Sequence, residues 1–257
     1  MIQIRSVSIL LLLGLLSGPL AGTGAGGRQA ADTRTPGGQS WPRRTASRQA
    51  TGRPQAGSPM DNIHAYVCGL HFYSGQPSRQ VIAHHYCARG RGELMQCVIY
   101  DSSRKDARLI GIEYVISAGL FETLSPVEQR LWHSHAYEVK SGLLAAPGLS
   151  GAAEQALMRN FATTYGKTWH TWQVDRDERL PLGIPQLMMG FTADGQVDPG
   201  LVAARDQALG VSTPELKRRR TGYPDPLVAP AADAWQLGAP LQLELRPAQP
   251  ITPIPMH

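Results

Sequence analysis

Beyond residue 60 the sequence has almost no net charge, because 18 Lys and Arg stand against 19 Asp and Glu. The formal charge of +5 arises in the first 60 residues, which hold seven Arg and one Asp. Binding to nucleic acid requires a basic patch or stripe on the folded surface. The charge pattern therefore gives no basis for a nucleic-acid partner.

The sequence also lacks the short motifs of several common catalytic classes. It contains no G-x-x-x-x-G-K phosphate-binding loop, no H-E-x-x-H metalloprotease helix and no G-x-S-x-G nucleophile turn. No pair of carboxylates stands out as a general acid and base. These absences favour a non-catalytic protein over an enzyme, without excluding one.

One apolar run, residues 7–22, follows Arg5 and ends just before the small residues of positions 23–25. It is short and interrupted by glycine and proline, which is typical of a secretory signal peptide and not of a membrane span. We expect residues 1–25 to direct export to the periplasm or the outside and to be removed there, with a retained N-terminal anchor as the alternative. After cleavage no membrane span is expected.

Residues 26–60 contain only Trp41 and Met60 as large apolar side chains. Such a segment cannot bury enough apolar surface to offset its chain entropy, so the sequence predicts a disordered linker. A single domain is expected over residues 61–247, followed by a flexible tail at 248–257.

Only three cysteines are present, and all lie within one short stretch. Cys87 and Cys97 flank Gly90 and Gly92, whose spacing indicates a hairpin turn between two strands. A disulfide between these two cysteines is therefore expected, and Cys68 would remain a thiol. A buried pair of free thiols and a metal-ligand role remain the alternatives.

Segments rich in β-branched and aromatic residues predict strands. The expected strands cover residues 80–88, 94–101, 107–117, 133–144, 167–175 and 185–193, with a further edge strand at 241–245.

Start and stop signals predict the helices. Ser125 and Glu128 have the spacing of a capping box, and Asp198 and Gly210 frame another helix. The expected helices cover residues 124–133, 150–166 and 198–210, with a short one from 213. Strands in runs with helices between them predict an α+β fold, with a mainly antiparallel sheet and three to four helices.

Several histidines form the candidate site: His84, His85, His133, His135 and His170. Because alternate residues of a strand face the same side, His133 and His135 are expected to point at one ligand. Two such histidines, joined by others from neighbouring strands, are typical of a Zn, Cu, Fe or Mn site. Glu138, Asp175 and Arg176 are expected to surround these donors.

Two other interpretations of the histidines remain open. Strands beside aromatic residues often carry histidines for hydrogen bonding alone, and His133 at a helix C-terminus is electrostatically favoured without a metal. A histidine that acts as a general acid or base is the other. No cofactor is therefore assigned from the sequence.

Four long segments resemble the oil body-associated protein family: "GLHFYSGQPSRQVIAHHYC", "QCVIYDSSRKDARLIGIEYVIS", "LFETLSPVEQRLWHSHAYEVKSGLL" and "YGKTWHTWQVDRDERLPLGIPQLMMGFT". The similarity runs in order from about residue 62 to residue 210. The resemblance implies that the "HHYC", "HSH" and "GKTWHTWQVDR" motifs are typical of the family. It carries over no established catalytic residues.

Plant members of that family associate with seed lipid bodies, so the resemblance implies a lipid or apolar small molecule as partner. The leader makes this chain resemble an exported, bacterial member. Two hypotheses follow. The first is a non-catalytic envelope protein that binds an apolar ligand, and the second is a histidine-rich metal-binding protein or metal-dependent enzyme. The sequence makes no prediction of oligomeric state.

Overall fold

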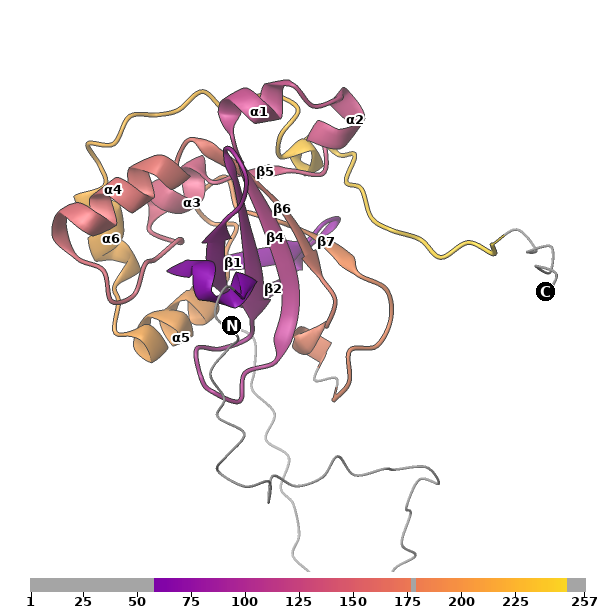
Figure 1. Ribbon diagram of the computed structural model, residues 1–257, viewed down its shortest axis with the longest axis horizontal. Coiled ribbons are helices and arrows are strands. Elements are labelled where there is room, and N and C mark those ends of the chain that lie inside the picture. The colour runs from indigo at the N-terminus through magenta and orange to yellow at the C-terminus, as the bar shows by residue number, and fades with distance from the viewer. Residues whose placement is uncertain (1–57, 177–178, 249–257) are drawn as a thin grey trace, which may run out of the picture. The chain divides into compact units, whose positions relative to one another are not determined.

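The computed structural model describes residues 58–176 and 179–248 (Figure 1). The expected signal peptide, the linker up to residue 57 and residues 249–257 of the expected tail lie outside these ranges. The described part begins with Ser58, whose side chain accepts a hydrogen bond from the Met60 amide and caps a short 3-10 helix, η1 (Pro59–Asn62). The first strand follows directly.

Seven strands make one sheet: β1 (Ile63–Tyr73), β2 (Gln76–Arg89), β3 (Leu94–Tyr100), β4 (Leu109–Ser117), β5 (His133–Ser134), β6 (Thr164–His170) and β7 (Gln186–Met189). All pairings are antiparallel, and the order is β4-β3-β2-β1-β7-β6-β5. β4 also pairs with β6, so six strands close on themselves. The antiparallel α+β prediction is confirmed, whereas the closure was not foreseen.

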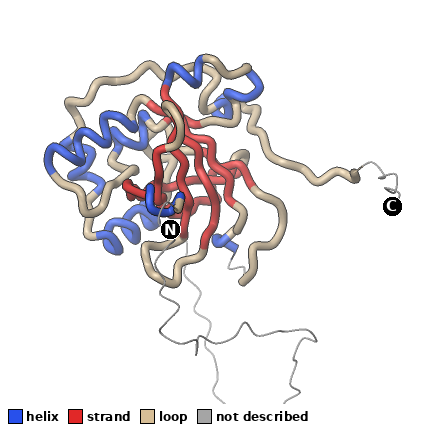
Figure 2. The backbone as a smooth tube through the Cα atoms, in the orientation of Figure 1, coloured by secondary structure: helices blue, strands red, loops and turns tan. Residues whose placement is uncertain are grey.

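Six α-helices lie within the described residues, more than the three to four expected: α1 (Ala118–Glu122), α2 (Pro126–Gln129), α3 (Ala136–Ser141), α4 (Gly151–Phe161), α5 (Pro199–Leu209) and α6 (Thr213–Arg219). Two further 3-10 turns are η2 (Val174–Arg176) and η3 (Ala234–Leu237). Figure 2 shows α3 to α6 gathered on one side of the strands, with α1 and α2 at one end. Among residues 58–176 and 179–248, no helix has the length and apolar character needed to cross a membrane.

The helix signals of α5 are confirmed. The Asp198 side chain accepts a hydrogen bond from the Gly200 amide, and Gly210 ends the helix with a left-handed backbone. The expected helix at 150–166 is correct only as far as Phe161, where α4 ends. The later residues form β6, because pairing with β4, β5 and β7 satisfies their backbone groups in three ladders.

The strand expected at 133–144 is wrong beyond Ser134, because the chain turns into α3. Ala136 and Val139 are buried three positions apart, which is helical spacing. Gly142 ends α3 at φ 82°, and a Cβ atom there would lie 2.6 Å from the Thr213 carbonyl oxygen of α6. Only glycine fits this close approach. The edge strand expected at 241–245 is absent, since residues 241–248 form no regular element.

Apolar clusters fill both sides of the strands. At one end of the closed sheet, inward side chains of the strands pack against Met158 and Phe161 of α4: Val67, Cys87, Cys97 and Val115. On the outside of β1 and β7, Leu70, Phe72, Leu187 and Met189 pack against Phe191. The middle of the interior of the closed sheet is polar, and it contains the histidines.

Candidate metal centre

Four strands contribute a histidine or a carboxylate to the interior of the closed sheet: His71 from β1, His85 from β2, Glu113 from β4 and His170 from β6. Alternate residues of a strand face the same side, and these four lie in the inward phase. Their exposed fractions lie between 0% and 4%. The antiparallel sheet thus buries a carboxylate among three imidazoles.

Two more imidazoles enter from β5 and the start of α3. His133 pairs with Gly166 of β6, and His135 is the N-cap residue of α3, with helical backbone angles. The two histidines therefore do not lie on one face of a single strand, as the sequence had predicted. Both side chains nevertheless reach Glu113 and are buried, because the turn into α3 keeps His135 on the inner side.

Three imidazole nitrogens converge on the Glu113 carboxylate. The Nε2 atoms of His85, His135 and His133 lie 3.1, 3.2 and 3.5 Å from its nearer oxygen. Two ligand atoms that each lie about 2.0–2.1 Å from a tetrahedral ion are roughly 3.3–3.4 Å apart. The observed spacing therefore suits donors arranged around a metal ion.

The ring nitrogens of His85 and His133 have no hydrogen-bond partner among the described residues. Their Nε2 atoms lie close to the carboxylate, but they do not point at it as a hydrogen bond requires. Leaving a buried polar group without a partner costs about 1–3 kcal/mol. A metal ion among these atoms would remove that cost.

The tautomer of His135 follows from Thr164. The Thr164 hydroxyl donates to the Phe161 carbonyl oxygen at 2.7 Å and lies 2.8 Å from His135 Nδ1. Because that hydroxyl has only one proton, it must accept from His135 Nδ1–H. The other ring nitrogen, Nε2, lies 3.2 Å from Glu113 Oε1, within hydrogen-bond distance. A hydrogen bond on the far nitrogen is the usual support of a metal-bound histidine.

Burial sets the protonation of most of these groups. It lowers the pKa of His133 and of His170 to about 3 and that of His71 well below its ordinary value, so these imidazoles are neutral at pH 7. Burial alone would raise the pKa of Glu113, but the electrostatic interaction with His85 and the hydrogen bond with His135 hold it well below its usual range. Neutral imidazole and ionised carboxylate are the forms that bind metal.

Glu138 lies at the edge of the cluster, with Oε2 3.9 Å from His133 Nε2. It is buried on α3, as the sequence hypothesis requires. Burial, together with the nearby charges of Glu113 and Asp233, raises its pKa well above the ordinary value.

Three predicted residues lie away from the cluster. His84 points to the outside of β2, where its Nδ1 lies 2.8 Å from the Tyr66 hydroxyl. Asp175 accepts hydrogen bonds from Arg79 and Tyr73, and Arg176 is exposed in η2. The 3-10 turn directs this acidic loop to the surface instead of toward the histidines.

Two members of the cluster were missed from the sequence: Glu113 and His71. Glu113 is a lone charge in the apolar strand 109–117, and it marks an inward polar position. His71 has the same strand phase as Tyr73, and its ring centroid lies 5.0 Å from that of His85. A charged residue in the middle of a buried strand was the available signal.

The cysteines lie beside the cluster without belonging to it. Cys87 and Cys97 are direct partners of β2 and β3 and form a disulfide, and Cys97 pairs with Glu113 across β3 and β4. Cys68 is a buried free thiol, and burial raises its pKa to about 12. The donor set at the centre is therefore imidazole and carboxylate alone.

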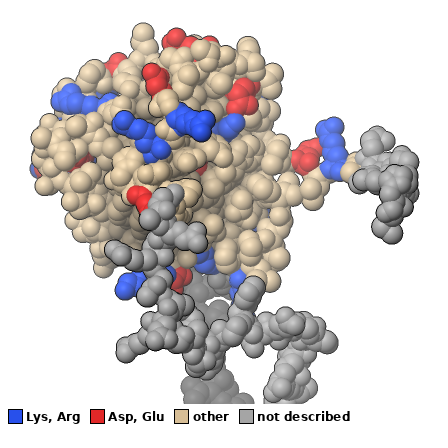
Figure 3. Space-filling model, in the orientation of Figure 1, with Lys and Arg blue, Asp and Glu red and all other residues tan. Residues whose placement is uncertain are grey.

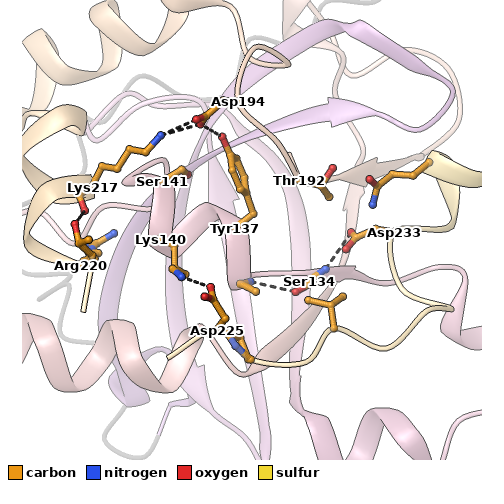
Figure 4. Close-up of a pocket in the computed structure, with 15 residues that line it drawn as sticks. Ser134, Tyr137, Lys140, Ser141, Thr192, Asp194, Lys217, Arg220, Asp225 and Asp233 are labelled. Carbon is orange, nitrogen blue, oxygen red and sulfur yellow. Dashed lines mark hydrogen bonds and ion pairs between the residues drawn. The ribbon is translucent and has the colours of Figure 1, made fainter. Parts of the chain in front are cut away.

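A cavity of about 580 Å³ lies on the outer side of α3 (Figure 4). Two ion pairs line it: Lys140 with Asp225, and Lys217 with Asp194. Because these four charges neutralise one another in pairs, the cavity carries no strong excess of either sign.

Ser134 lies between this cavity and the candidate metal centre. It lies between His133 and His135, lines the cavity, and donates its backbone N–H to Asp233 Oδ1 at 3.1 Å. Asp233 has a left-handed backbone at φ 53°, and burial raises its pKa to about 7. Ser134 of β5 thus lines the cavity, whereas its neighbours His133 and His135 face Glu113.

Fold and site together define an α+β protein whose closed antiparallel sheet surrounds a histidine–carboxylate cluster. The family model described as "Protein of unknown function (DUF1264)" matches residues 57–224. Oil body-associated protein 2A of Zea mays is 46% identical over 170 residues, which cover 65% of this chain and 68% of that protein. No solved structure matches the chain.

Two further relatives are as similar. Oil body-associated protein 2C of Arabidopsis thaliana is 47% identical over 181 residues, covering 69% of this chain and 76% of the relative. Oil body-associated protein 1A of Zea mays is 42% identical over 199 residues, covering 77% and 83%. The chain belongs to the oil body-associated protein family. These relatives are plant proteins, so they do not support the expected bacterial source.

Proposed function

We propose that the chain binds a divalent transition metal through Glu113, His85, His133 and His135. The observation that carries this proposal is the convergence of three Nε2 atoms on one buried carboxylate. Imidazole and carboxylate donors without thiolate suit Zn, Fe, Mn or Cu(II).

His84 shows how a purely structural histidine looks in the same strand. It is stacked beside Tyr66, and its Nδ1 has a hydrogen-bond partner in the Tyr66 hydroxyl. His85, the next residue, lacks such a partner at both ring nitrogens among the described residues. The contrast favours metal ligation over structural hydrogen bonding for His85 and its neighbours.

The burial of the donors points to a structural and non-catalytic ion. Glu113, His85, His133 and His135 are exposed by between 0% and 4%, so a substrate could not reach an ion among them without movement of the chain. An ion there joins β2, β4, β5 and the start of α3. It also neutralises a carboxylate that is costly to bury alone.

Cobalt titration of the metal-stripped full chain tests the proposal, because Co²⁺ absorbs visible light far more strongly in a four- or five-coordinate protein site than as the free aqua ion. We expect saturable visible bands in the wild-type chain and in His84→Ala, and bands of clearly lower amplitude in the His133→Ala/His135→Ala double variant. His84→Ala is the matched control, since it removes a buried imidazole outside the cluster. Equal bands in all three folded proteins would contradict the proposal.

An exposed apolar sheet face favours a second function, docking on a lipid surface. Outward positions of β2, β3 and β4 carry Tyr86, Val98, Tyr100, Ile112 and Tyr114. Ile112 and Tyr114 are 37% and 36% exposed. Figure 3 shows few charged side chains over β4, below a row of Lys and Arg.

The surroundings of this face suit an anionic phospholipid layer. Arg104 and Lys105 line a hollow at one end of the face, together with Met60 of η1. In the sequence, seven arginines precede residue 58, and Ser58 caps η1. Basic residues beside an apolar surface bind anionic lipid, and the names of the relatives concern oil bodies.

Sedimentation with vesicles tests this second function. The full chain is expected to bind vesicles of phosphatidylcholine with phosphatidylserine, and Ile112→Glu/Tyr114→Glu is expected to abolish binding. Val127→Glu alters an apolar side chain that is 70% exposed on α2 and should have no effect. Undiminished binding by the double variant, or self-association through this face without vesicles, would overturn the assignment.

Export is the remaining part of the proposal. Residues 1–25 have the composition of a signal peptide. N-terminal sequencing of the protein from a bacterial host is expected to give periplasmic material that starts at Gly26. Cytoplasmic material that retains Met1 would contradict it.

A further inference from the structure

The two oxygens of Glu113 face different groups of histidines. Oε1 lies 3.2 Å from His135 Nε2 and 3.5 Å from His133 Nε2, whereas Oε2 lies 3.1 Å from His85 Nε2. The ligand atoms of His71, His85 and Glu113 lie within 4.8 Å of one another, and so do those of Glu113, His133 and His135. One carboxylate is therefore common to two sets of three donors.

We propose that the cluster holds two divalent transition-metal ions bridged by Glu113. One ion takes Oε1 with His133 and His135, and the other takes Oε2 with His85 and His71. This inference rests on the proposed metal-binding function and adds its stoichiometry. Five protein donors exceed the four of a tetrahedral ion, and paired ions about 3.5–4 Å apart are common in metalloproteins.

Each set of three has a fourth buried group at its outer end. On the Oε2 side, His170 Nε2 lies 3.4 Å from His71 Nδ1, and His170 Nδ1 has no partner among the described residues. On the Oε1 side, Glu138 Oε2 lies 3.9 Å from His133 Nε2. The arrangement is thus similar on both sides of the Glu113 carboxylate.

The rings form a continuous group and not two separate pockets. The centroid of His71 lies 5.0 Å from that of His85, 5.6 Å from that of His133 and 5.5 Å from that of His170. The centroids of His133 and His135 are 5.2 Å apart. Two ions in this space would share Glu113, which explains why one acid serves so many imidazoles.

Zinc stoichiometry tests the inference. The stripped full chain is loaded with Zn²⁺, freed of unbound ion by gel filtration and measured by elemental analysis. We expect two ions per wild-type chain and two in His84→Ala. One ion is expected in His71→Ala and one in His133→Ala. His71→Gln replaces His71→Ala if that variant does not fold.

The outcomes separate the inference from the function on which it rests. One ion in the wild-type chain that His71→Ala does not alter would overturn the paired site and leave the metal-binding function standing. No bound ion would overturn both. Crystals of the zinc-loaded chain are expected to show two anomalous peaks about 3.5–4 Å apart beside Glu113, and a single peak would also overturn the pair.

Discussion

His84 and His85 are neighbours in β2 but lie on opposite sides of the sheet. His84 is bonded to Tyr66 on the outside, whereas His85 faces Glu113 inside without a hydrogen-bond partner among the described residues. Strand alternation alone produces this difference. The pair therefore offers a direct comparison between a histidine held by the protein and one available to an ion.

Thermal melting with and without zinc should separate these two histidines. A bound ligand stabilises the folded state in proportion to the logarithm of its concentration over its Kd. Zinc is expected to raise the Tm of wild type and of His84→Ala by more than that of His85→Ala. His84→Ala should instead lower stability by about 1 kcal/mol, with or without zinc, through loss of its hydrogen bond. Equal zinc responses in both variants would refute the assignment of His85.

Thr164→Val should weaken metal binding although Thr164 contacts no ion. The change removes the Thr164 hydroxyl, which accepts a hydrogen bond from His135 Nδ1–H. That hydrogen bond holds the His135 ring in the tautomer protonated at Nδ1. Losing such an outer partner typically lowers metal affinity about 10–100-fold. Competition of zinc with a chromophoric chelator measures this affinity. The neighbouring exposed residue supplies the control, Thr163→Val, for which no change is expected; a similar loss there would argue against a specific role of Thr164.

Gly166→Ala should disturb the centre by contact alone. A Cβ atom at Gly166 would lie 2.0 Å from Glu113 Oε1 and 2.8 Å from His135 Nε2, so both side chains must move. Overpacking of this kind costs about 1–3 kcal/mol. Urea unfolding should show this loss, and zinc affinity should fall with it. Gly119→Ala in α1, where the nearest atom would be 3.9 Å away, should retain wild-type affinity.

The stability contributed by Asp233 should depend on pH. Its pKa is raised by burial to about 7 in the folded state, from an ordinary value of 3.8. Between these values the folded chain keeps a proton that the unfolded chain releases, so stability falls as pH rises. Relative to Asp233→Asn, the wild-type free energy of unfolding should fall by about 1.4 kcal/mol per pH unit up to pH 7. Urea unfolding from pH 5 to pH 8 measures it, and a constant difference would disprove the shift.

Local signals in the sequence predicted much of the fold. The caps at Asp198 and Gly210 place α5 correctly, and the β-branched segments locate β2, β3 and β4. Closure of the sheet was not predictable, because the pairing of β4 with β6 joins residues far apart in the chain and leaves no local pattern. The helix α3 was missed because its six residues follow a histidine pair that also suits a strand.

The candidate site was predictable in its imidazoles and not in its centre. His85, His133 and His135 lie around Glu113, and His170 lies beside His71. Histidines in neighbouring strands were the visible signal. Glu113 was overlooked because a single acid in an apolar strand shows its role only when the register brings it beside His85 and His135.

Elemental analysis of the untreated full chain is the most direct test of metal binding at Glu113. The protein is purified without a histidine tag and without chelators, beside Glu113→Gln, which preserves the size of the side chain and removes its charge. We expect at least one Zn, Fe, Mn or Cu ion per wild-type chain and none in the variant. A well-folded wild-type chain that contains no metal and takes up none from added zinc would contradict this expectation.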